Sequence, residues 1–454
     1  MKSEESMFAG IKLRKCLFLT AFVIILCSCG SRRTLQIPYN GPIHVSENGK
    51  VAIEATPVVT PLEAPQPEVL QNPLPLTSNI EKAPAGTWKG NVQAGLDSLC
   101  RLPLFQTTQL GLYVFDLTDQ LPVYAVNATQ RMRPASNQKI VTSICGLHYL
   151  GGDYLFRTDL RIKGTVANGT LQGDVYVVGG MDPMLSPSNL AEMAAALRNA
   201  GISSIAGNLY IDLSMKDNLA YGWGWCWDDK DGPLSALMVD AKDKFNTEWG
   251  KALAKAGIRC SKPTIRQQQI PADTRSVLCV THTIDEVLQP LLKNSHNIYA
   301  ESLFYQIAAY SGQKNAGRKQ AAKLINDLIQ QLDMQPEQYQ IADGSGLSLY
   351  NYVSPELLVG LLNYAFSNPD IYQHLYPALP IAGVDGTLSK RMQDTPAYNN
   401  VHAKTGTVDG VSTLSGYLTA SNGHVLSFSI MNQGVSYSRQ GREFQDKVCV
   451  LLCQ

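Results

Sequence analysis

The sequence predicts an α/β fold of the α+β type, with an antiparallel sheet flanked by helices and one smaller inserted mixed domain. Alternating apolar and polar residues predict two hairpins, at residues 110–126 and 412–431. Apolar residues at helical spacing predict a run of helices at residues 284–367. A second group of strand patterns, at residues 154–282, separates the first hairpin from these helices. We therefore expect this group to form the inserted domain.

Residues 1–29 have the pattern of a secretion signal. A basic stretch at residues 12–15 precedes an apolar run at residues 16–26. This run is shorter than the stretch of about 20 apolar residues that a transmembrane helix needs. The small residues before Cys29 resemble a bacterial lipoprotein signal, so Cys29 is the expected lipidation site. An uncleaved anchor helix is the alternative. Both interpretations export the chain to the cell envelope, on the periplasmic side of a membrane.

Residues 30–86 carry nine of the 24 prolines and show neither a helical nor an alternating pattern. Proline-rich sequence stays extended and semi-rigid, so we expect a tether that holds the following body away from a membrane. The body begins at about residue 87 and is long enough for two domains.

Composition excludes several classes of partner and cofactor. The net charge is zero and no basic run follows the signal, so nucleic acid is not an expected partner. The seven histidines show no metal-ligand spacing, and no metal or cofactor is predicted. Seven of the ten cysteines lie in the body without a disulfide framework, which favours mostly buried free thiols. A bridge between Cys260 and Cys279 is the one pairing that we consider. The sequence gives no prediction of oligomeric state.

The inserted segment is predicted to contain strands at residues 154–165, 170–178 and 208–213, with a helix at 187–199. Its unusual feature is three tryptophans within residues 223–227. They could line a substrate groove, but packing between the two domains is the favoured interpretation.

The first chemical motif is Ser136 with Lys139, at the start of a predicted helix that continues through apolar residues to about residue 147. Their spacing of three puts both side chains on one helical face, so the lysine can accept the serine proton. The helix N-terminus adds donors for an oxyanion. Ser311 and Lys314 have the same spacing, but they lie in a glycine- and lysine-rich loop that we interpret as a solvated turn.

The second motif is Ser295 with Asn297, in the turn between two predicted helices. Both side chains can face a cleft, where the serine would relay a proton and the asparagine amide would bind substrate. The alternative is an ordinary helix N-cap, because serine and asparagine are common there.

The third motif runs from Lys404 through Thr405 and Gly406 to Thr407 on a predicted strand. The lysine would supply positive charge for a substrate carboxylate, and the glycine would let a peptide backbone lie against the strand. The Thr407 N–H can complete an oxyanion hole. The alternative is an edge lysine followed by a glycine bulge.

Together and in this order, the three motifs resemble those of D-alanyl-D-alanine carboxypeptidases/endopeptidases of the penicillin-binding protein 4 type, peptidase family S13. The resemblance covers about residues 90–445. It extends to four further segments, residues 173–183, 297–301, 343–348 and 382–388.

The resemblance implies a penicillin-binding-protein/β-lactamase-like transpeptidase domain, formed by residues 87–156 and 284–454 and interrupted by an inserted domain at 157–283. It implies attack on the peptide bond after a D-alanine in peptidoglycan stem peptides or cross-links. The resulting acyl-enzyme would be released by water, and β-lactams would acylate the same serine.

The resemblance also assigns roles to the motif residues. Ser136 would be the nucleophile, Lys139 its base and Ser295 the proton relay. Substrate would be held by Asn297 and by the third motif, Lys404, Thr405, Gly406 and Thr407. The backbone N–H groups of Ser136 and Thr407 would form the oxyanion hole.

Two departures from the family pattern stand out: His296 lies where aspartate or asparagine is usual, and the segment between the first two motifs is shorter than in the best-known members. The shorter segment predicts one inserted domain rather than two.

Three alternatives remain at the sequence level. A β-lactamase shares the scaffold, but the body lacks a Glu-x-x-x-Asn element to position the deacylating water. A non-catalytic peptidoglycan-binding or β-lactam-sensing module is the alternative from a different class, and a purely structural lipoprotein is the third.

Overall fold

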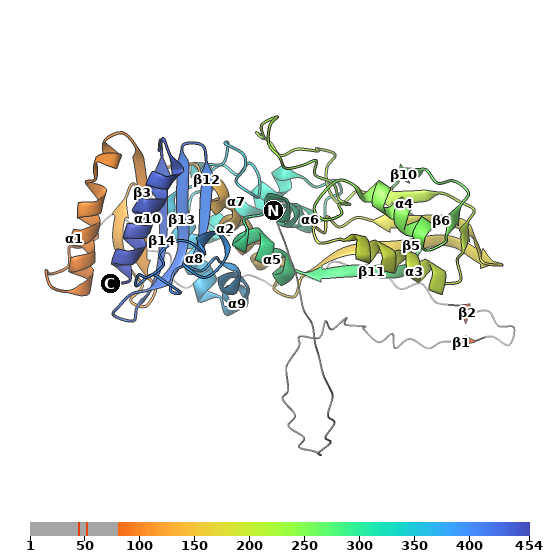
Figure 1. Ribbon diagram of the computed structural model, residues 1–454, viewed down its shortest axis with the longest axis horizontal. Coiled ribbons are helices and arrows are strands. Elements are labelled where there is room, and N and C mark those ends of the chain that lie inside the picture. Colours follow the sequence, from red (N-terminus) through yellow and green to blue (C-terminus); the bar gives the residue numbers. More distant parts are fainter. Residues whose placement is uncertain (1–43, 46–50, 53–79) are drawn as a thin grey trace, which may run out of the picture. The chain divides into compact units, whose positions relative to one another are not determined.

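The computed structural model describes residues 44–45, 51–52 and 80–454 (Figure 1). The predicted signal, Cys29 and most of the predicted tether lie outside these residues. Strands β1 (His44–Val45) and β2 (Val51–Ala52) form a short antiparallel pair in the N-terminal unit. In the part of the chain that the structure describes, every helix is too short or too polar to cross a bilayer.

The larger part of the body is organised around a five-stranded antiparallel sheet in the order β12-β13-β14-β3-β4. Its strands are β3 (Gln109–Asp116), β4 (Leu121–Val126), β12 (His402–Val408), β13 (Val411–Thr419) and β14 (Val425–Gln433). Both predicted hairpins are confirmed, and β14 pairs with β3, which joins the early and late parts of the body in one sheet.

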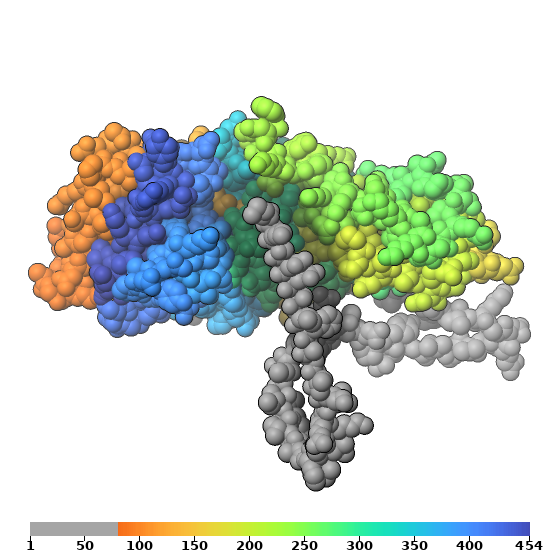
Figure 2. Space-filling model, viewed as in Figure 1, coloured from red at the N-terminus to blue at the C-terminus, as the bar shows by residue number. Residues whose placement is uncertain are grey.

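The sheet is buried on both faces because its side chains alternate between two cores. On β3, Tyr113 and Phe115 face a core built with helices α2 (Gln138–Leu150) and α8 (Pro355–Ser367). Leu112 and Val114 face the opposite core. The second core includes α1 (Trp88–Cys100) and α10 (Ser438–Leu452), which lie side by side although they come from opposite ends of the body (Figure 2).

The predicted helical run is confirmed, with α5 (Ile284–Lys293), α6 (Asn297–Tyr310), α7 (Arg318–Gln331) and α8. Helices α9 (Pro369–Ala378) and α10 were not predicted. The first core buries the apolar faces of α2 and α5 to α9, so the first and second motifs both border one packed body.

A second sheet lies between the first and second motifs in the sequence. Its main order is β10-β8-β6-β5-β11, and β7 joins β6 while β9 joins β7. Its strands are β5 (Leu155–Ala167), β6 (Thr170–Val178), β7 (Ser204–Ile205), β8 (Leu209–Asp212), β9 (Arg259–Cys260), β10 (Ile265–Gln267) and β11 (Arg275–Thr283).

Helices α3 (Pro187–Asn199) and α4 (Phe245–Lys255) pack with this sheet in a core of their own (Figure 1). The predicted strands at residues 154–165, 170–178 and 208–213 correspond to β5, β6 and β8. Helix α4 and the short strands β7, β9 and β10 were not predicted. The division of the body into domains stays a prediction.

The bridge considered between Cys260 and Cys279 does not form. Cys260 lies on β9 and Cys279 on β11, and strands β7, β6 and β5 separate them. All seven described cysteines are free thiols. The expectation that most are buried is only partly right, because Cys226 and Cys279 are exposed.

Candidate active site

Ser136 lies in a short 3₁₀ turn, η3 (Ala135–Asn137), which leads directly into α2. Two side chains of β13 hold this turn in place. The Thr413 hydroxyl donates to the Pro134 carbonyl at 2.8 Å, and Asn137 contacts the Ser415 hydroxyl at 2.7 Å. The nucleophile candidate is therefore fixed at a point where a helix start meets the central sheet.

Lys139 is fully buried one turn after Ser136, and its Nζ lies 3.1 Å from the Ser136 hydroxyl oxygen. The same ammonium group donates to the Asn297 side-chain oxygen at 2.7 Å and to the Ser345 carbonyl at 2.8 Å. The predicted pairing on one helical face thus has hydrogen-bonding geometry. Asn297, from the second motif, accepts a hydrogen bond from the same Lys139 nitrogen.

Burial lowers the pKa of Lys139 from 10.5 to about 8, because a charged ammonium loses water of solvation. Three carboxylates, on Asp343, Glu301 and Asp231, oppose this effect by stabilising the charge. A lysine with a pKa near 8 has a neutral fraction of about one tenth at pH 7. That fraction is large enough for it to act as a base toward a serine.

The second motif lies in the turn between α5 and α6. Ser295 has a positive φ of 59°, which is uncommon for a residue other than glycine, and within the described residues its hydroxyl has no hydrogen-bond partner. The N-cap of α6 is His296, which makes no side-chain cap bond. The alternative of an ordinary serine or asparagine cap is therefore not what the structure contains. The structure brings the Asn297 side chain to Lys139, whereas no hydrogen bond among the described residues joins Ser295 to Lys139.

The third motif lies on β12, at the edge of the five-stranded sheet. Lys404 is fully buried, so it is not an exposed edge lysine, and its Nζ donates to the Thr405 carbonyl at 2.7 Å. Burial and the nearby Lys139 charge hold the pKa of Lys404 well below its usual value. The Thr405 hydroxyl donates to the Thr387 hydroxyl at 2.8 Å, and Thr407 is exposed.

Gly406 has no room for a side chain, because β12 passes directly beside the Ser136 turn. A Cβ atom there would lie 2.8 Å from the Pro134 carbonyl oxygen and 3.0 Å from the Ser136 nitrogen. It would also lie 2.2 Å from the Thr413 hydroxyl. The sequence suggested that this glycine makes room for a peptide substrate. The structure gives a second reason for glycine at this position: β12 approaches the backbone of Ser136 so closely that a side chain would not fit.

Asp231 is a site residue that the sequence did not reveal. It lies in the loop between β8 and α4, and its carboxylate accepts a hydrogen bond from the Asn297 amide at 2.6 Å. Asn297 therefore joins a lysine on one side to a carboxylate on the other. The only signal was a cluster of aspartates after the tryptophans, at residues 228–231, which is equally typical of a solvated loop.

Glu301 and Asp343 hold the loop that offers the Ser345 carbonyl to Lys139. Glu301 is buried on α6 and accepts the Gly344 and Ser345 N–H groups, while Asp343 accepts the N–H of Gly346. Burial, together with the charge of Asp343, raises the pKa of Glu301. Both residues belong to segments that carry the family resemblance, but no sequence pattern assigns either of them a role.

The three tryptophans have different environments. The Trp225 indole donates to the Asp343 carboxylate at 2.9 Å, and Trp223 packs on Tyr350 with ring centroids 5.1 Å apart. These contacts agree with the interpretation of packing between the two regions. Trp227 differs, because it is 97% exposed.

One group of side chains among the described residues has the spacing to hold a metal ion: Asp116, Asp119 and His424. It lies at the turns that end β3 and begin β14, and the His424 ring contacts the Asp116 carboxylate at 2.7 Å. None of its members belongs to the three motifs. The candidate active site is thus built from serine, lysine, amide and carboxylate groups.

A family model and individual relatives assign this chain to the same family of proteins. The family model described as "D-Ala-D-Ala carboxypeptidase 3 (S13) family" matches residues 92–248 and 230–454. A D-alanyl-D-alanine carboxypeptidase from Actinomadura sp. (strain R39) is 26% identical over 438 residues, covering 75% of this chain and 80% of the relative.

Solved structures show the same fold. Penicillin binding protein 4 (dacB) from Haemophilus influenzae matches with a TM-score of 0.71 and 24% identity, covering 78% of this chain and 97% of that one. A predatory peptidoglycan endopeptidase from Bdellovibrio bacteriovorus matches with a TM-score of 0.53 and 16% identity, covering 76% of this chain and 92% of that one. The predicted penicillin-binding-protein type of fold is confirmed.

Proposed function

This chain belongs to the D-Ala-D-Ala carboxypeptidase 3 (S13) family of peptidases, and we propose that it acts through a serine acyl-enzyme. The bond cleaved is the peptide bond that follows a D-alanine, in peptidoglycan stem peptides as a carboxypeptidase or in cross-links as a D,D-endopeptidase. The observation that carries the proposal is the 3.1 Å contact between Lys139 Nζ and the Ser136 hydroxyl oxygen, in a site where burial lowers the lysine pKa.

Acylation begins with neutral Lys139, which takes the hydroxyl proton as Ser136 attacks the D-alanine carbonyl carbon. The negative charge that develops on the carbonyl oxygen is held by the backbone N–H groups of Ser136 and Thr407. The proximity of β12 to the Ser136 nitrogen supports this arrangement, because both donors lie on neighbouring backbone segments.

Collapse of the tetrahedral intermediate breaks the peptide bond and leaves the acyl group on Ser136. The departing amine needs a proton, and Ser295 relays it from Lys139. Water then attacks the ester carbonyl while Lys139 takes one of its protons. Lys139 passes that proton to the Ser136 oxygen as the ester bond breaks, which releases the shortened peptide and restores the serine hydroxyl. These steps consume one water for each peptide bond and need no cofactor.

Substrate is held by the remaining motif residues. The Asn297 amide contacts the substrate backbone, and the strand from Lys404 through Thr405 and Gly406 to Thr407 binds the peptide and its carboxylate. A buried lysine with few direct partners supports this role for Lys404, since a substrate carboxylate would compensate its charge.

β-Lactams are the expected inhibitors, because their amide offers the same carbonyl to Ser136 and the ring opening leaves a stable ester. The name of the related penicillin binding protein 4 from Haemophilus influenzae supports this part of the proposal. We also propose that the protein is an exported lipoprotein, anchored through Cys29 and carried on the tether at residues 30–86.

The test is incubation of the purified protein with muropeptides and analysis by mass spectrometry, with Ser136→Ala as the comparison. Loss of one D-alanine, or conversion of cross-linked dimers to monomers, in wild type alone supports the peptidase. Ser311→Ala is the matched control, because it removes the serine of the exposed look-alike motif. Labelling of Ser136 by a fluorescent penicillin with no product from either substrate would instead favour the non-catalytic sensing module.

A further inference from the structure

Residues 380–388 run beside the first part of β12 and leave its later part open. The Ala403 N–H donates to the Pro380 carbonyl at 2.9 Å, on the edge of β12 that faces away from β13. Alternate residues of a strand direct their N–H groups to the same edge, so the N–H groups of Thr405 and Thr407 also face this edge. Among the described residues, β13 is the one strand that pairs with β12, and the open edge therefore begins at Thr405.

Thr387 lies beside the start of this open edge, on the 3₁₀ turn η5 (Gly386–Leu388). Its hydroxyl oxygen accepts a hydrogen bond from the Thr405 hydroxyl at 2.8 Å. The residue is exposed, and its own hydroxyl proton has no acceptor among the described residues. A threonine hydroxyl offers one donor and two acceptor sites, so Thr387 can donate to a ligand while it keeps its bond to Thr405.

Two anchors fix the turn that carries Thr387. On one side, the Asp385 carboxylate pairs with Lys293 Nζ at 2.6 Å and accepts the Ile381 N–H at 2.8 Å. Lys293 is the last residue of α5, so this ion pair ties the turn to the helix that precedes the second motif. On the other side, Leu388 is fully buried. A hydroxyl held from both sides has little freedom left to lose when a ligand binds.

Lys404 provides a cation next to this pair of hydroxyls. It precedes Thr405 on β12, and within the described residues its Nζ donates only to the Thr405 carbonyl. Burial disfavours its charged form, and a bound anion would stabilise that form. A carboxylate accepts hydrogen bonds strongly from hydroxyl donors and is stabilised by a nearby ammonium group. The start of the open edge therefore has the groups that a carboxylate requires.

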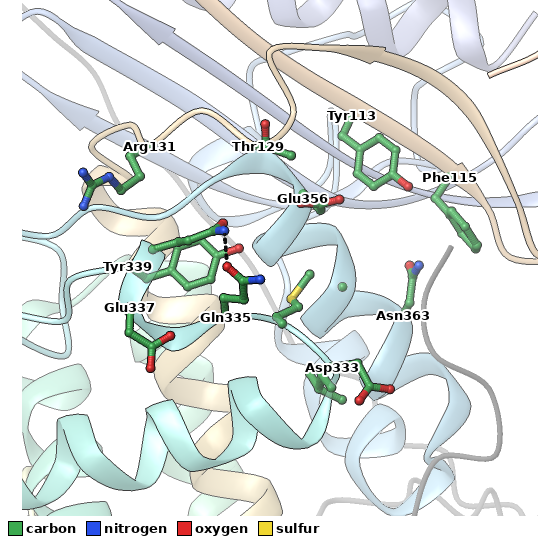
Figure 3. Close-up of a pocket in the computed structure, with 14 residues that line it drawn as sticks. Tyr113, Phe115, Thr129, Arg131, Asp333, Gln335, Glu337, Tyr339, Glu356 and Asn363 are labelled. Atoms are coloured by element: carbon green, nitrogen blue, oxygen red, sulfur yellow. Dashed lines mark hydrogen bonds between the residues drawn. The ribbon is translucent and has the colours of Figure 1, made fainter. Parts of the chain in front are cut away.

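The cavity between β3 and α8 does not offer an alternative place for a carboxylate (Figure 3). Its volume is about 660 Å³, which is ample for a small ligand. The charged side chains that line it are three carboxylates and one guanidinium: Asp333, Glu337, Glu356 and Arg131. This excess of negative charge would repel an anionic ligand, whereas the edge of β12 presents Lys404.

We propose that Thr387 is a further substrate-binding residue, which donates a hydrogen bond to the free carboxylate of the residue that follows the cleaved bond. Thr405 holds the Thr387 hydroxyl in place by donating to its oxygen. A carbonyl bound at Thr407 puts the next substrate residue beside Thr405, because residues two apart in a strand are separated by about 7 Å. A chain that continued past this point would meet η5, so the turn favours a residue that ends in a carboxylate. This inference rests on the proposed function, since it names the group that the same site recognises.

The first experiment compares acylation of the purified full-length protein by benzylpenicillin, which carries a carboxylate, and by its methyl ester. The ratio of the two second-order rate constants, followed by intact-protein mass spectrometry, measures carboxylate recognition. Thr387→Val removes the hydroxyl at nearly constant volume and should lower this ratio about tenfold, the low end for one hydrogen bond to a charged group. The rate with the ester should stay at the wild-type value, and Thr387→Ser should keep most of the preference because it keeps the hydroxyl.

Thr281→Val is the matched control, because Thr281 is exposed on β11 in the second sheet and makes no side-chain hydrogen bond within the described residues. Its ratio should equal that of wild type. A merely structural role for Thr387 would slow acylation by both compounds equally. Equal loss with the acid and the ester, or an unchanged ratio in Thr387→Val, would therefore overturn the proposal.

A second measurement needs no acylation. Isothermal titration of the Ser136→Ala protein with N-acetyl-D-alanyl-D-alanine and with its C-terminal amide should show tighter binding of the acid. Adding Thr387→Val should reduce this preference about tenfold. If wild type neither cleaved muropeptides nor reacted with penicillin, the proposed function would fail, but this preference would still identify Thr387 as a carboxylate-binding residue. Equal affinity for the acid and the amide, or the same preference with and without Thr387→Val, would overturn the inference.

Discussion

Asn297 connects Lys139 to Asp231, because its side-chain oxygen accepts from the Lys139 ammonium at 2.7 Å and its amide nitrogen donates to the Asp231 carboxylate at 2.6 Å. Asp231 comes from the loop between β8 and α4, in the region that carries the second sheet. The two regions are therefore electrostatically connected at the proposed catalytic base. The negative charge of Asp231 raises the pKa of Lys139 and partly offsets the effect of burial.

Asp231→Asn should shift the pH dependence of acylation to lower pH. The asparagine keeps an acceptor for the Asn297 amide but removes the negative charge that favours the protonated lysine. The pKa of Lys139 should then fall further below about 8. The measurement is the rate of labelling by a fluorescent penicillin as a function of pH. Asp229→Asn is the control, since its carboxylate accepts from the Cys226 N–H in the same loop. A profile that stays in place, or moves to higher pH, would contradict this role for Asp231.

Lys139→Arg should reduce acylation by about 10²- to 10⁴-fold, the range that a positioned base contributes. Arginine keeps the positive charge but cannot lose a proton near neutral pH. In wild type the labelling rate should rise with pH through about 8, as the lysine becomes neutral. Lys314→Arg, in the exposed look-alike motif, should leave the rate unchanged. Substantial activity in Lys139→Arg would assign the base to another group.

The sequence was most informative where contacts are local. Ser136 and Lys139 are three residues apart in a helix start, so their proximity follows from helical geometry alone. The two hairpins follow from alternation, because each strand has a partner close in sequence. Strands β7 and β9 were missed because each has two residues, too few to show alternation.

Contacts between distant segments could not be predicted in the same way. Asp231 is 66 residues before Asn297, and its loop has no periodic pattern that fixes where it lies. Helix α10 is different, because Phe444, Val448 and Leu452 recur every four residues and are all buried. That spacing is a helical signal that can be read from the sequence alone.

Glu301→Gln should weaken the pH dependence of stability. The pKa of Glu301 is raised above its usual 4.5, by burial and by Asp343, so the folded state binds this proton more tightly than the unfolded state. Its contribution to stability is complete below pH 4.5 and is lost as the pH rises through the raised pKa. Glutamine stays neutral and can still accept from the Gly344 and Ser345 N–H groups.

Thermal unfolding at a series of pH values between 4 and 9 tests this effect. The difference in melting temperature between Glu301→Gln and wild type should increase toward alkaline pH. Glu443→Gln is a suitable control, because this residue forms only an exposed ion pair with Arg439. If the difference in melting temperature between Glu301→Gln and wild type stayed constant over this pH range, the pKa of Glu301 would not differ between the folded and unfolded states.

Gly406→Ala should impair both stability and acylation, because the added methyl group has no space between β12 and the Ser136 turn. Its Cβ would lie 2.2 Å from the Thr413 hydroxyl and 3.0 Å from the Ser136 nitrogen, so the strand or the turn must move. Overpacking of this kind costs about 1–3 kcal/mol. Displacement of the Ser136 N–H should also weaken the proposed oxyanion hole, and we expect the loss in penicillin-labelling rate to exceed what the unfolded fraction explains.

Gly250→Ala provides the opposite case in the same chain. Gly250 lies inside α4, and a Cβ there would meet no atom within 4 Å. Alanine has a higher helix propensity, so this variant should be more stable by about 0.5–1 kcal/mol and label at the wild-type rate. The two glycines therefore separate the general effect of adding a methyl group from the specific effect beside Ser136. If Gly406→Ala folded and labelled like wild type, the close approach of β12 would not be what positions the nucleophile.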